Sequence, residues 1–367
     1  MFENAGQLLA WTRPQDPEAF GSRTGDPLGL RVFVRHLAGR ISPALTRSCT
    51  EVWGFGLLSL GLQVVGHGVD AERRFLRWQR LLIFAAVHED LDAPGWRTGG
   101  TQRAKAYLAG SGAVSLDRVL LTHERAAGIW GGYARASRIY GLIRQVAPGT
   151  GPGAFGTTPA GDLLAGATRA ALVAPSVARL SKLVSRSNEV DLEQLGLTFP
   201  EVSGTQIRHL SAAVRANDQR HGGRLIGLWP QLDGIDTPQP SELDPGTLAN
   251  ADQRLAVEHA TAVSGLVEQV EDAFRSGDAL RLTPGLASHP GFEYAKEAGY
   301  GLEYEPVRTA LAGGGQDALA ALWSLHQQRH PQNGRWSRDE PIASWANTVP
   351  DFGLDAPLAL YRQGVRL

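Results

Sequence analysis

The sequence predicts a mainly α-helical protein with a few short strands, and three observations support this fold class. Apolar residues recur at helical spacing in several long segments, and residues typical of helix starts precede them. Only one glycine-rich segment near the middle of the chain suggests a pair of strands. With 367 residues, of which 43% are hydrophobic and 20% charged, the chain can bury a sizeable core and is expected to form two or three domains.

The first predicted helices lie in the N-terminal part. Residues 26–47 have apolar residues at helical spacing, and residues 52–65 form an apolar run that we interpret as a buried helix or strand pair. A clearer helix spans residues 70–88, with Asp70 as N-cap. One of its faces is apolar, and another is predicted to present three basic side chains: Arg73, Arg77 and Arg80.

Residues 139–170 follow a largely helical segment and predict a strand, a glycine-rich loop, a second strand and a new helix. The dipeptide Thr158-Pro159 supplies a hydroxyl N-cap followed by proline at the first helical position. We expect Leu163 and Leu164 of this helix to pack under the hairpin. Further along, Ser203-Gly204-Thr205-Gln206 predicts a capping box.

This order resembles the end of winged-helix domains, through Gly141-Leu142-Ile143 and residues 158–164. In that family the helix before the first strand enters the major groove, and the wing touches the DNA backbone or minor groove. The resemblance implies a winged-helix-like unit with nucleic-acid-binding arginines at Arg125, Arg135, Arg138 and Arg144. Winged helices also bind proteins, so docking of a protein is an alternative.

Charge is divided unequally along the chain. Residues 1–230 contain 26 Lys/Arg and 18 Asp/Glu, whereas residues 231–367 contain 10 and 19. We therefore predict an N-terminal helical domain (1–112), a winged-helix-like domain (113–230) and an acidic C-terminal helical domain (231–367). The acidic domain, including a helix over residues 247–276, is expected to bind a protein partner rather than DNA. The three arginines of residues 70–88 are further candidate phosphate contacts, and a looser basic group follows: Arg208, Arg215, Arg220 and Arg224.

Several kinds of chemistry are not indicated. The sequence has no P-loop, no dinucleotide fingerprint and no nucleophile elbow, and Cys49 is its only cysteine. His326 and His330 are four residues apart but have no evident third ligand. We therefore expect no metal and no cofactor. The N-terminus lacks the basic start of a signal peptide, and the longest apolar run falls short of the ~20 residues that span a bilayer, so a cytoplasmic protein without membrane contact is expected.

Four segments together resemble uncharacterised helical accessory proteins of bacterial anti-phage defence islands, which are encoded beside helicases and nucleases. These segments are residues 43–47 before Trp53, Arg73–Leu82, the hairpin with its following helix, and Leu325–Trp336. The resemblance implies a non-enzymatic nucleic-acid-binding subunit of a multi-protein defence or DNA-processing system, with a helicase or nuclease as partner. Two alternatives stay open: a nuclease or other hydrolase with a site assembled from dispersed His, Asp and Glu residues, and a structural protein-docking adaptor.

Overall fold

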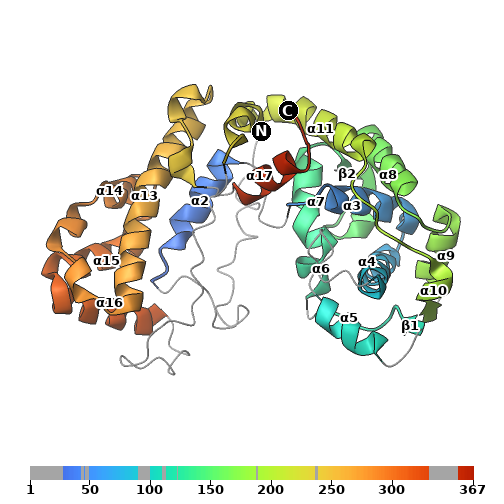
Figure 1. Cartoon of the computed structure of the whole chain (residues 1–367), viewed down its shortest axis with the longest axis horizontal. Helices are drawn as coiled ribbons and strands as arrows, with labels where there is room; N and C mark the ends of the chain where they lie inside the picture. Colours follow the sequence, from blue (N-terminus) through green and yellow to red (C-terminus); the bar gives the residue numbers. More distant parts are fainter. Residues whose placement is uncertain are drawn as a thin grey trace. The chain divides into compact units, whose positions relative to one another are not determined.

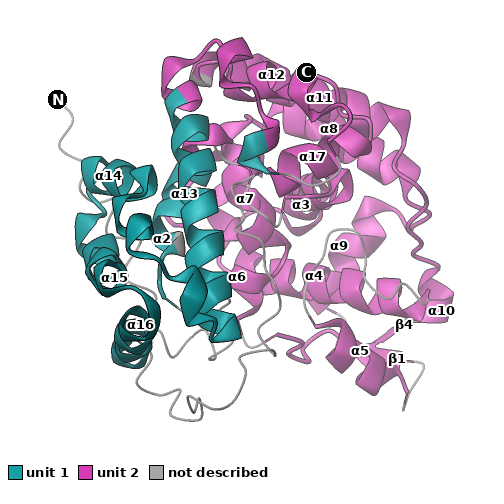
Figure 2. Cartoon of the chain, turned by 60° about the vertical axis from the view of Figure 1, so that its left-hand side comes forward, with its two compact units in different colours: residues 1–38, 239–241, 255–352 teal, residues 39–238, 242–254, 353–367 magenta. Residues whose placement is uncertain are grey.

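The computed structural model divides the chain into two compact units (Figures 1 and 2). Unit 1 contains residues 1–38, 239–241 and 255–352; unit 2 contains residues 39–238, 242–254 and 353–367. The structure describes residues 28–42, 45, 49–89, 100–109, 113–121, 123–186, 189–235, 239–329 and 354–367. Helices dominate and the few strands are short, which confirms the predicted fold class. The units differ from the three predicted domains because most residues of the first two, and both ends of the third, pack together in unit 2.

Unit 2 is built around helix α3 (Val52–Val65), whose residues are buried except for Gln63. Five helices pack against it: α4 (Ala71–His88), α7 (Ile129–Ile139), α8 (Pro159–Ala171), α9 (Val177–Arg186) and α11 (Gly204–Asp218). A helix that is apolar on every side is stable only when it is enclosed in this way. The apolar run over residues 52–65 is thus a central helix and not a pair of strands.

Glycines in α3 allow its neighbours to approach closely. A Cβ atom on Gly56 would lie 2.0 Å from the hydroxyl oxygen of Thr168 on α8, and one on Gly54 would lie 2.0 Å from the ring of Tyr133 on α7. Real Cβ atoms do not come this close to other atoms, so larger residues at these positions would force the helices apart. The interruption of the apolar run by glycine therefore has a packing function.

Two small antiparallel sheets lie in unit 2. Strand β2 (Ile143–Gln145) pairs with β3 (Phe155–Thr157), and β1 (Ala113–Ser115) pairs with β4 (Glu189–Asp191). The predicted hairpin is therefore present, and the short 3-10 helix η1 (Pro152–Ala154) lies in its loop. It packs on the start of α8, as predicted. Of the two leucines expected beneath it, Leu164 is buried, but Leu163 is 57% exposed and that expectation was wrong.

Helix starts in this region follow the predicted local signals. Thr158 accepts a hydrogen bond from the Gly161 N–H and caps α8, and Ser203 with Gln206 forms a full capping box at α11. A Cβ atom on Gly161 would lie 2.0 Å from the Leu142 carbonyl oxygen, so glycine at this position lets α8 start directly beneath β2.

The remaining elements of unit 2 are short and cover the edges of this helical core. They comprise α5 (Thr101–Leu108), α6 (Glu124–Ala127), α10 (Leu192–Leu195), α12 (Arg224–Leu228), and the 3-10 helices η2 (Gln219–His221), η3 (Trp229–Leu232), η4 (Pro240–Glu242, shared with unit 1) and η5 (Pro245–Thr247).

The C-terminal helix α17 (Asp355–Arg362) also belongs to unit 2. The side-chain oxygen of Gln363 accepts the Val52 N–H at 3.0 Å, and thereby satisfies the first N–H of the central helix α3. The Trp229 indole donates to the Val365 carbonyl oxygen at 3.0 Å. A segment that follows all of unit 1 in the sequence thus completes the core of unit 2.

Unit 1 is helical throughout its described part. It contains residues 31–38 of α2 (Arg31–Ile41), most of α13 (Ala251–Ser276), α14 (Pro290–Glu297), α15 (Gly301–Gly313) and α16 (Gly315–Arg329), with the 3-10 helices η6 (Ala279–Arg281) and η7 (Pro284–Ser288). Aromatic contacts join these helices: Phe33 packs on Tyr300, and Phe274 packs on Trp323. The predicted 247–276 helix begins at Ala251, and Leu255 on it is 44% exposed.

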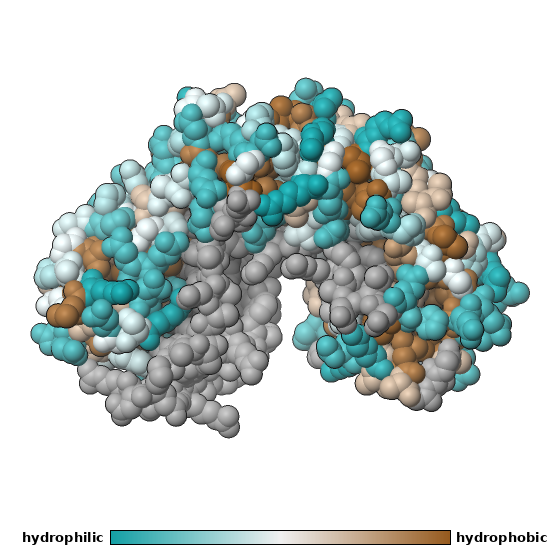
Figure 3. Space-filling model, in the orientation of Figure 1, coloured by the Kyte–Doolittle hydropathy of each residue, from teal (hydrophilic) through white to brown (hydrophobic). Residues whose placement is uncertain are grey.

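On the face shown in Figure 3, hydrophilic residues predominate and hydrophobic residues form small separated groups. Among the described residues, no helix combines the length and the apolar character that a membrane crossing requires.

Candidate nucleic-acid interface

The arginines of α4 do not form the exposed basic face that was predicted. Arg77 and Arg80 are 4% and 8% exposed, so their assignment as nucleic-acid contacts was wrong. Arg80 forms a buried ion pair with Glu124, in which its Nε lies 2.9 Å from Oε1, and it also donates to the Leu116 carbonyl oxygen. These contacts occupy its guanidinium group inside unit 2.

Arg77 is held in a comparable way by Asp117. Its Nη2 lies 2.6 Å from one carboxylate oxygen of Asp117, and its Nη1 donates to the Val184 carbonyl oxygen at 3.2 Å. The hydrogen bond from Arg77, followed by the attraction of its charge, holds the pKa of Asp117 below its ordinary value. Arg73 is exposed and lies 3.4 Å from the same carboxylate. Of the three arginines predicted on this face of α4, only Arg73 is exposed.

Arg125 fastens the tip of the hairpin to α4. Its Nη2 donates to the Thr150 hydroxyl at 2.6 Å, and its Nη1 lies 3.6 Å from Glu72 near the start of α4. Close packing continues at Gly153, where a Cβ atom would lie 3.0 Å from the Ala71 side chain. The tip that a wing would extend toward DNA therefore rests on α4, and Arg125 is engaged in holding it there.

The position of α7 is fixed by Gln79, which is fully buried on α4. Its amide donates to the Glu124 carbonyl oxygen at 3.3 Å and accepts the Ile129 N–H at 2.9 Å, so one side chain bridges the break between α6 and α7. A Cβ atom on Gly128 would lie 1.9 Å from the Gln79 side-chain oxygen. Glycine at this break thus lets the two helices meet around the Gln79 amide.

Three of the predicted site residues lie at the surface near the end of α7. Arg135 and Arg138 are exposed and three residues apart, so they are neighbours on the helix, and Arg144 is exposed on β2. None of them forms an ion pair with a described residue. Arg138 also lies in the last turn of α7, where a cation stabilises the helix end.

A fourth arginine joins this group through tertiary contacts. The Asn217 side chain of α11 donates to the Tyr140 carbonyl oxygen at 2.8 Å, at the end of α7. Arg220 donates to the Asn217 side-chain oxygen at 3.4 Å and forms no ion pair within the described part of the chain. We refer to Arg135, Arg138, Arg144 and Arg220 as the α7 basic surface. The sequence placed Arg220 in another basic group, because the contact between α11 and α7 has no local signal.

Another member of that second group has a structural partner. Arg224 donates to Asp252 at 2.8 Å, and Arg40 binds the same carboxylate. The hydrogen bond from Arg40, together with the charges of both arginines, lowers the pKa of Asp252.

The charge asymmetry follows the two units. Unit 2 contains 25 Lys/Arg and 20 Asp/Glu, whereas unit 1 contains 11 and 17. Within the described residues, no group of three or more His, Cys, Asp or Glu residues is placed to hold a metal ion. His326 is buried against Phe274 and Trp323, and His330 lies outside the described residues.

Comparison with family models, with curated proteins and with solved structures finds no match to this chain.

Proposed function

We propose that unit 2 binds the nucleic-acid backbone through the α7 basic surface, and that the protein is a non-enzymatic subunit of a multi-protein bacterial defence or DNA-processing system. The observation that supports this proposal is the group of four exposed arginines that have no acidic partner among the described residues. An arginine left unpaired at the surface can donate two hydrogen bonds to one phosphate.

Phosphate contact is favoured over reading of bases. The hairpin tip is fastened to α4, so the loop is not extended as a wing, and the basic groups come from a helix, a strand and a neighbouring helix end. Contacts of this type fix a protein on the nucleic-acid backbone without selecting a sequence. We therefore expect binding that depends strongly on salt and weakly on sequence.

The test is a fluorescence-anisotropy titration of a 20-base-pair duplex with the full chain over a series of salt concentrations. Arg135→Ala with Arg138→Ala should weaken binding and reduce the salt dependence by roughly two phosphate contacts, about 1.8 in the slope of log K against log salt. Arg179→Ala with Arg186→Ala is the matched control, because both arginines are exposed on α9 and lie away from the α7 basic surface in sequence and contacts.

Equal losses of duplex affinity in the two double variants would contradict the assignment of the α7 basic surface as the binding surface. If the unaltered protein does not bind the duplex in a salt-dependent way, the proposed function is wrong. Thermal unfolding followed by circular dichroism identifies any variant whose folding is impaired.

We propose in addition that acidic unit 1 binds a protein partner, such as a helicase or nuclease. Glu258, Glu268 and Asp272 are exposed on α13, whereas Glu271 is buried and paired with Arg275. Charge reversal of the three exposed acids should abolish co-purification of the partner and leave DNA affinity unchanged. Co-purification that survives the reversal would contradict this proposal.

A further inference from the structure

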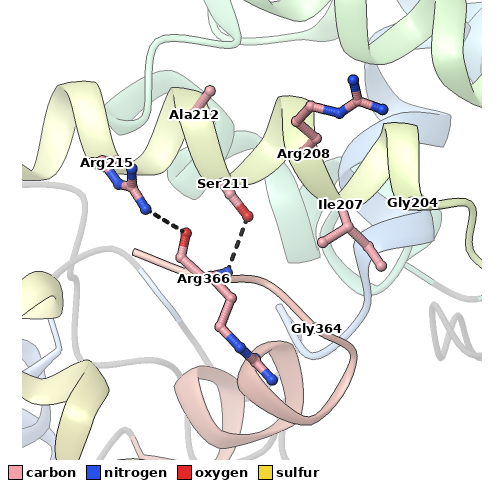
Figure 4. A pocket seen from close by; sticks show the side chains of 8 residues that line it. All are labelled: Gly204, Ile207, Arg208, Ser211, Ala212, Arg215, Gly364 and Arg366. Atoms are coloured by element: carbon pink, nitrogen blue, oxygen red, sulfur yellow. Dashed lines mark hydrogen bonds between the residues drawn. The ribbon is translucent and has the colours of Figure 1, made fainter.

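A pocket of about 330 Å³ lies in unit 2 between α11 and the last residues of the chain (Figure 4). Six of its lining residues belong to one face of α11, and two belong to the segment after α17. The full lining is Gly204, Ile207, Arg208, Ser211, Ala212, Arg215, Gly364 and Arg366. The volume is at the lower end of the range of small-ligand sites, about 300–1,000 Å³.

The pocket is basic. Arg208, Arg215 and Arg366 are exposed, and none of them forms an ion pair with a residue that the structure describes. No acidic residue lines the pocket. Arginines that line a concavity attract an anion to it.

Two donors point from α11 toward the C-terminal segment, as Figure 4 shows for Ser211 and Arg215. The Ser211 hydroxyl oxygen accepts the Arg366 N–H at 3.1 Å, so its own hydrogen is available to a ligand. Arg215 gives one N–H to the Arg366 carbonyl oxygen at 3.3 Å. The remaining N–H groups of Arg215 are not used in this contact.

Arg208 also lines the pocket, nearly two helical turns before Arg215 on α11. In Figure 4 its side chain points away from the C-terminal segment. Its guanidinium donates to the Thr205 hydroxyl at 3.3 Å, a single long contact that a rotation of the side chain breaks at small cost. Arg208 lies seven residues from Arg215, almost two helical turns, so both are on the same face.

The rest of the lining is apolar and small. A Cβ atom on Gly364 would lie 3.5 Å from Ile207, and the φ of +93° at Gly364 further disfavours larger residues there. Ala212 adds a methyl group. Arg366 is fixed beside them, because its guanidinium stacks 4.4 Å from the centre of the Tyr361 ring.

We propose that this pocket binds a small organic phosphate. Its phosphate accepts hydrogen bonds from Arg215 and Ser211, Arg208 rotates to close over it, and the organic portion lies on Ile207 and Gly364. The site is separate from the α7 basic surface. Asn217, which contacts the end of α7, is about 200° around α11 from Arg215. The proposal therefore does not depend on nucleic-acid binding.

Isothermal titration calorimetry of the full chain with adenosine monophosphate, inorganic phosphate and adenosine tests the proposal. The monophosphate should bind at least tenfold more tightly than inorganic phosphate, and adenosine should not bind. Arg208→Ala with Arg215→Ala should weaken binding of the monophosphate at least tenfold, whereas the α9 pair Arg179→Ala with Arg186→Ala should not change it. Arg208→Glu, at an exposed position of α11, provides a second variant in case the double variant folds poorly.

Three results would overturn the assignment. The first is the absence of binding by adenosine monophosphate, or binding that both α11 variants leave unchanged. The second is inorganic phosphate binding as tightly as the monophosphate, because the apolar lining then contributes nothing. The third is a loss of affinity for a 20-base-pair duplex that is as large in Arg208→Ala with Arg215→Ala as in Arg135→Ala with Arg138→Ala. The pocket would then bind the nucleic-acid backbone.

Discussion

Arg80 of α4 and Glu124 at the start of α6 form an ion pair in which both side chains are buried, at 8% and 7% exposure. The same carboxylate accepts the Leu120 N–H at 2.9 Å. Glu124 therefore holds α4 and α6 together and also supports the loop before α6.

Glu124→Gln should destabilise unit 2 by about 3–5 kcal/mol, because it leaves the buried Arg80 charge without its partner. Urea unfolding followed by tryptophan fluorescence measures the change. Glu72→Gln, which alters the surface pair with Arg125, is the control and should cost about 0–1 kcal/mol. The combination of Arg80→Met with Glu124→Leu should recover much of the loss, and a double variant as unstable as the single one would contradict this account.

Gly56→Ala and Gly166→Ala should change stability in opposite directions. The new methyl group on α3 would meet Thr168, so Gly56→Ala should cost about 1–3 kcal/mol. Gly166 on α8 has no atom within 4 Å of its Cβ position, so alanine there should stabilise the helix by about 0.5–1 kcal/mol. The thermal unfolding midpoints of the two single variants are compared with that of the unaltered protein. A Gly56→Ala variant with a higher midpoint would contradict the close packing of α3 on α8.

The start of α14 in unit 1 should loosen as pH falls below about 6.5. His289 caps this helix through Nδ1, which accepts the Gly291 N–H at 3.1 Å, and burial lowers the pKa of His289 from 6.5. Neutral His289 therefore contributes stability above pH 6.5, and this contribution is lost as pH falls through the lowered pKa of the folded state.

Hydrogen exchange of the α14 amides between pH 5 and pH 7.5, corrected for intrinsic rates, should show this loss of protection. His289→Asn keeps a capping oxygen that does not titrate, so its protection should not vary with pH. A variant with the same pH dependence as the unaltered protein would show that another group is responsible.

Gln363→Ala should destabilise unit 2 by about 1–3 kcal/mol, because the Val52 N–H at the start of the buried α3 loses its acceptor. Gln194→Ala changes an exposed glutamine of α10 and should stay within about 0.5 kcal/mol of the unaltered protein. Chemical unfolding of both variants gives the comparison. Equal stabilities would mean that the C-terminal segment is not needed for the core.

Local signals in the sequence predicted the local structure well. The Thr158 cap and the Ser203 capping box both depend on residues within a few positions of one another, and the structure has each of them. The start of α13 was placed too early by four residues. The Asn250 side chain accepts the Gln253 N–H, and the helix begins only after it.

The burial of Arg77 and Arg80 on α4 could not be predicted from the same signals. Helical periodicity shows that Arg73, Arg77 and Arg80 lie toward one side of the helix, but it does not show what covers that side. The partners Asp117 and Glu124 lie about 40 residues further along the chain, and the loop and helix that carry them enclose Arg77 and Arg80. Arg220 was not predicted as part of the candidate interface, because it is linked to α7 only through tertiary contacts of Asn217. Such contacts leave no signal in the local sequence.

The division of unit 2 in the sequence has a consequence for synthesis of the protein. Residues 39–254 leave the ribosome well before residues 353–367, which supply the acceptor for the first N–H of α3. At about 5–20 residues per second, the roughly 100 intervening residues take roughly 5–20 s to translate. During that interval the first N–H of α3 lacks its acceptor, and the start of this helix is not yet covered by the C-terminal segment. Chaperones or proteases can bind there before synthesis is complete.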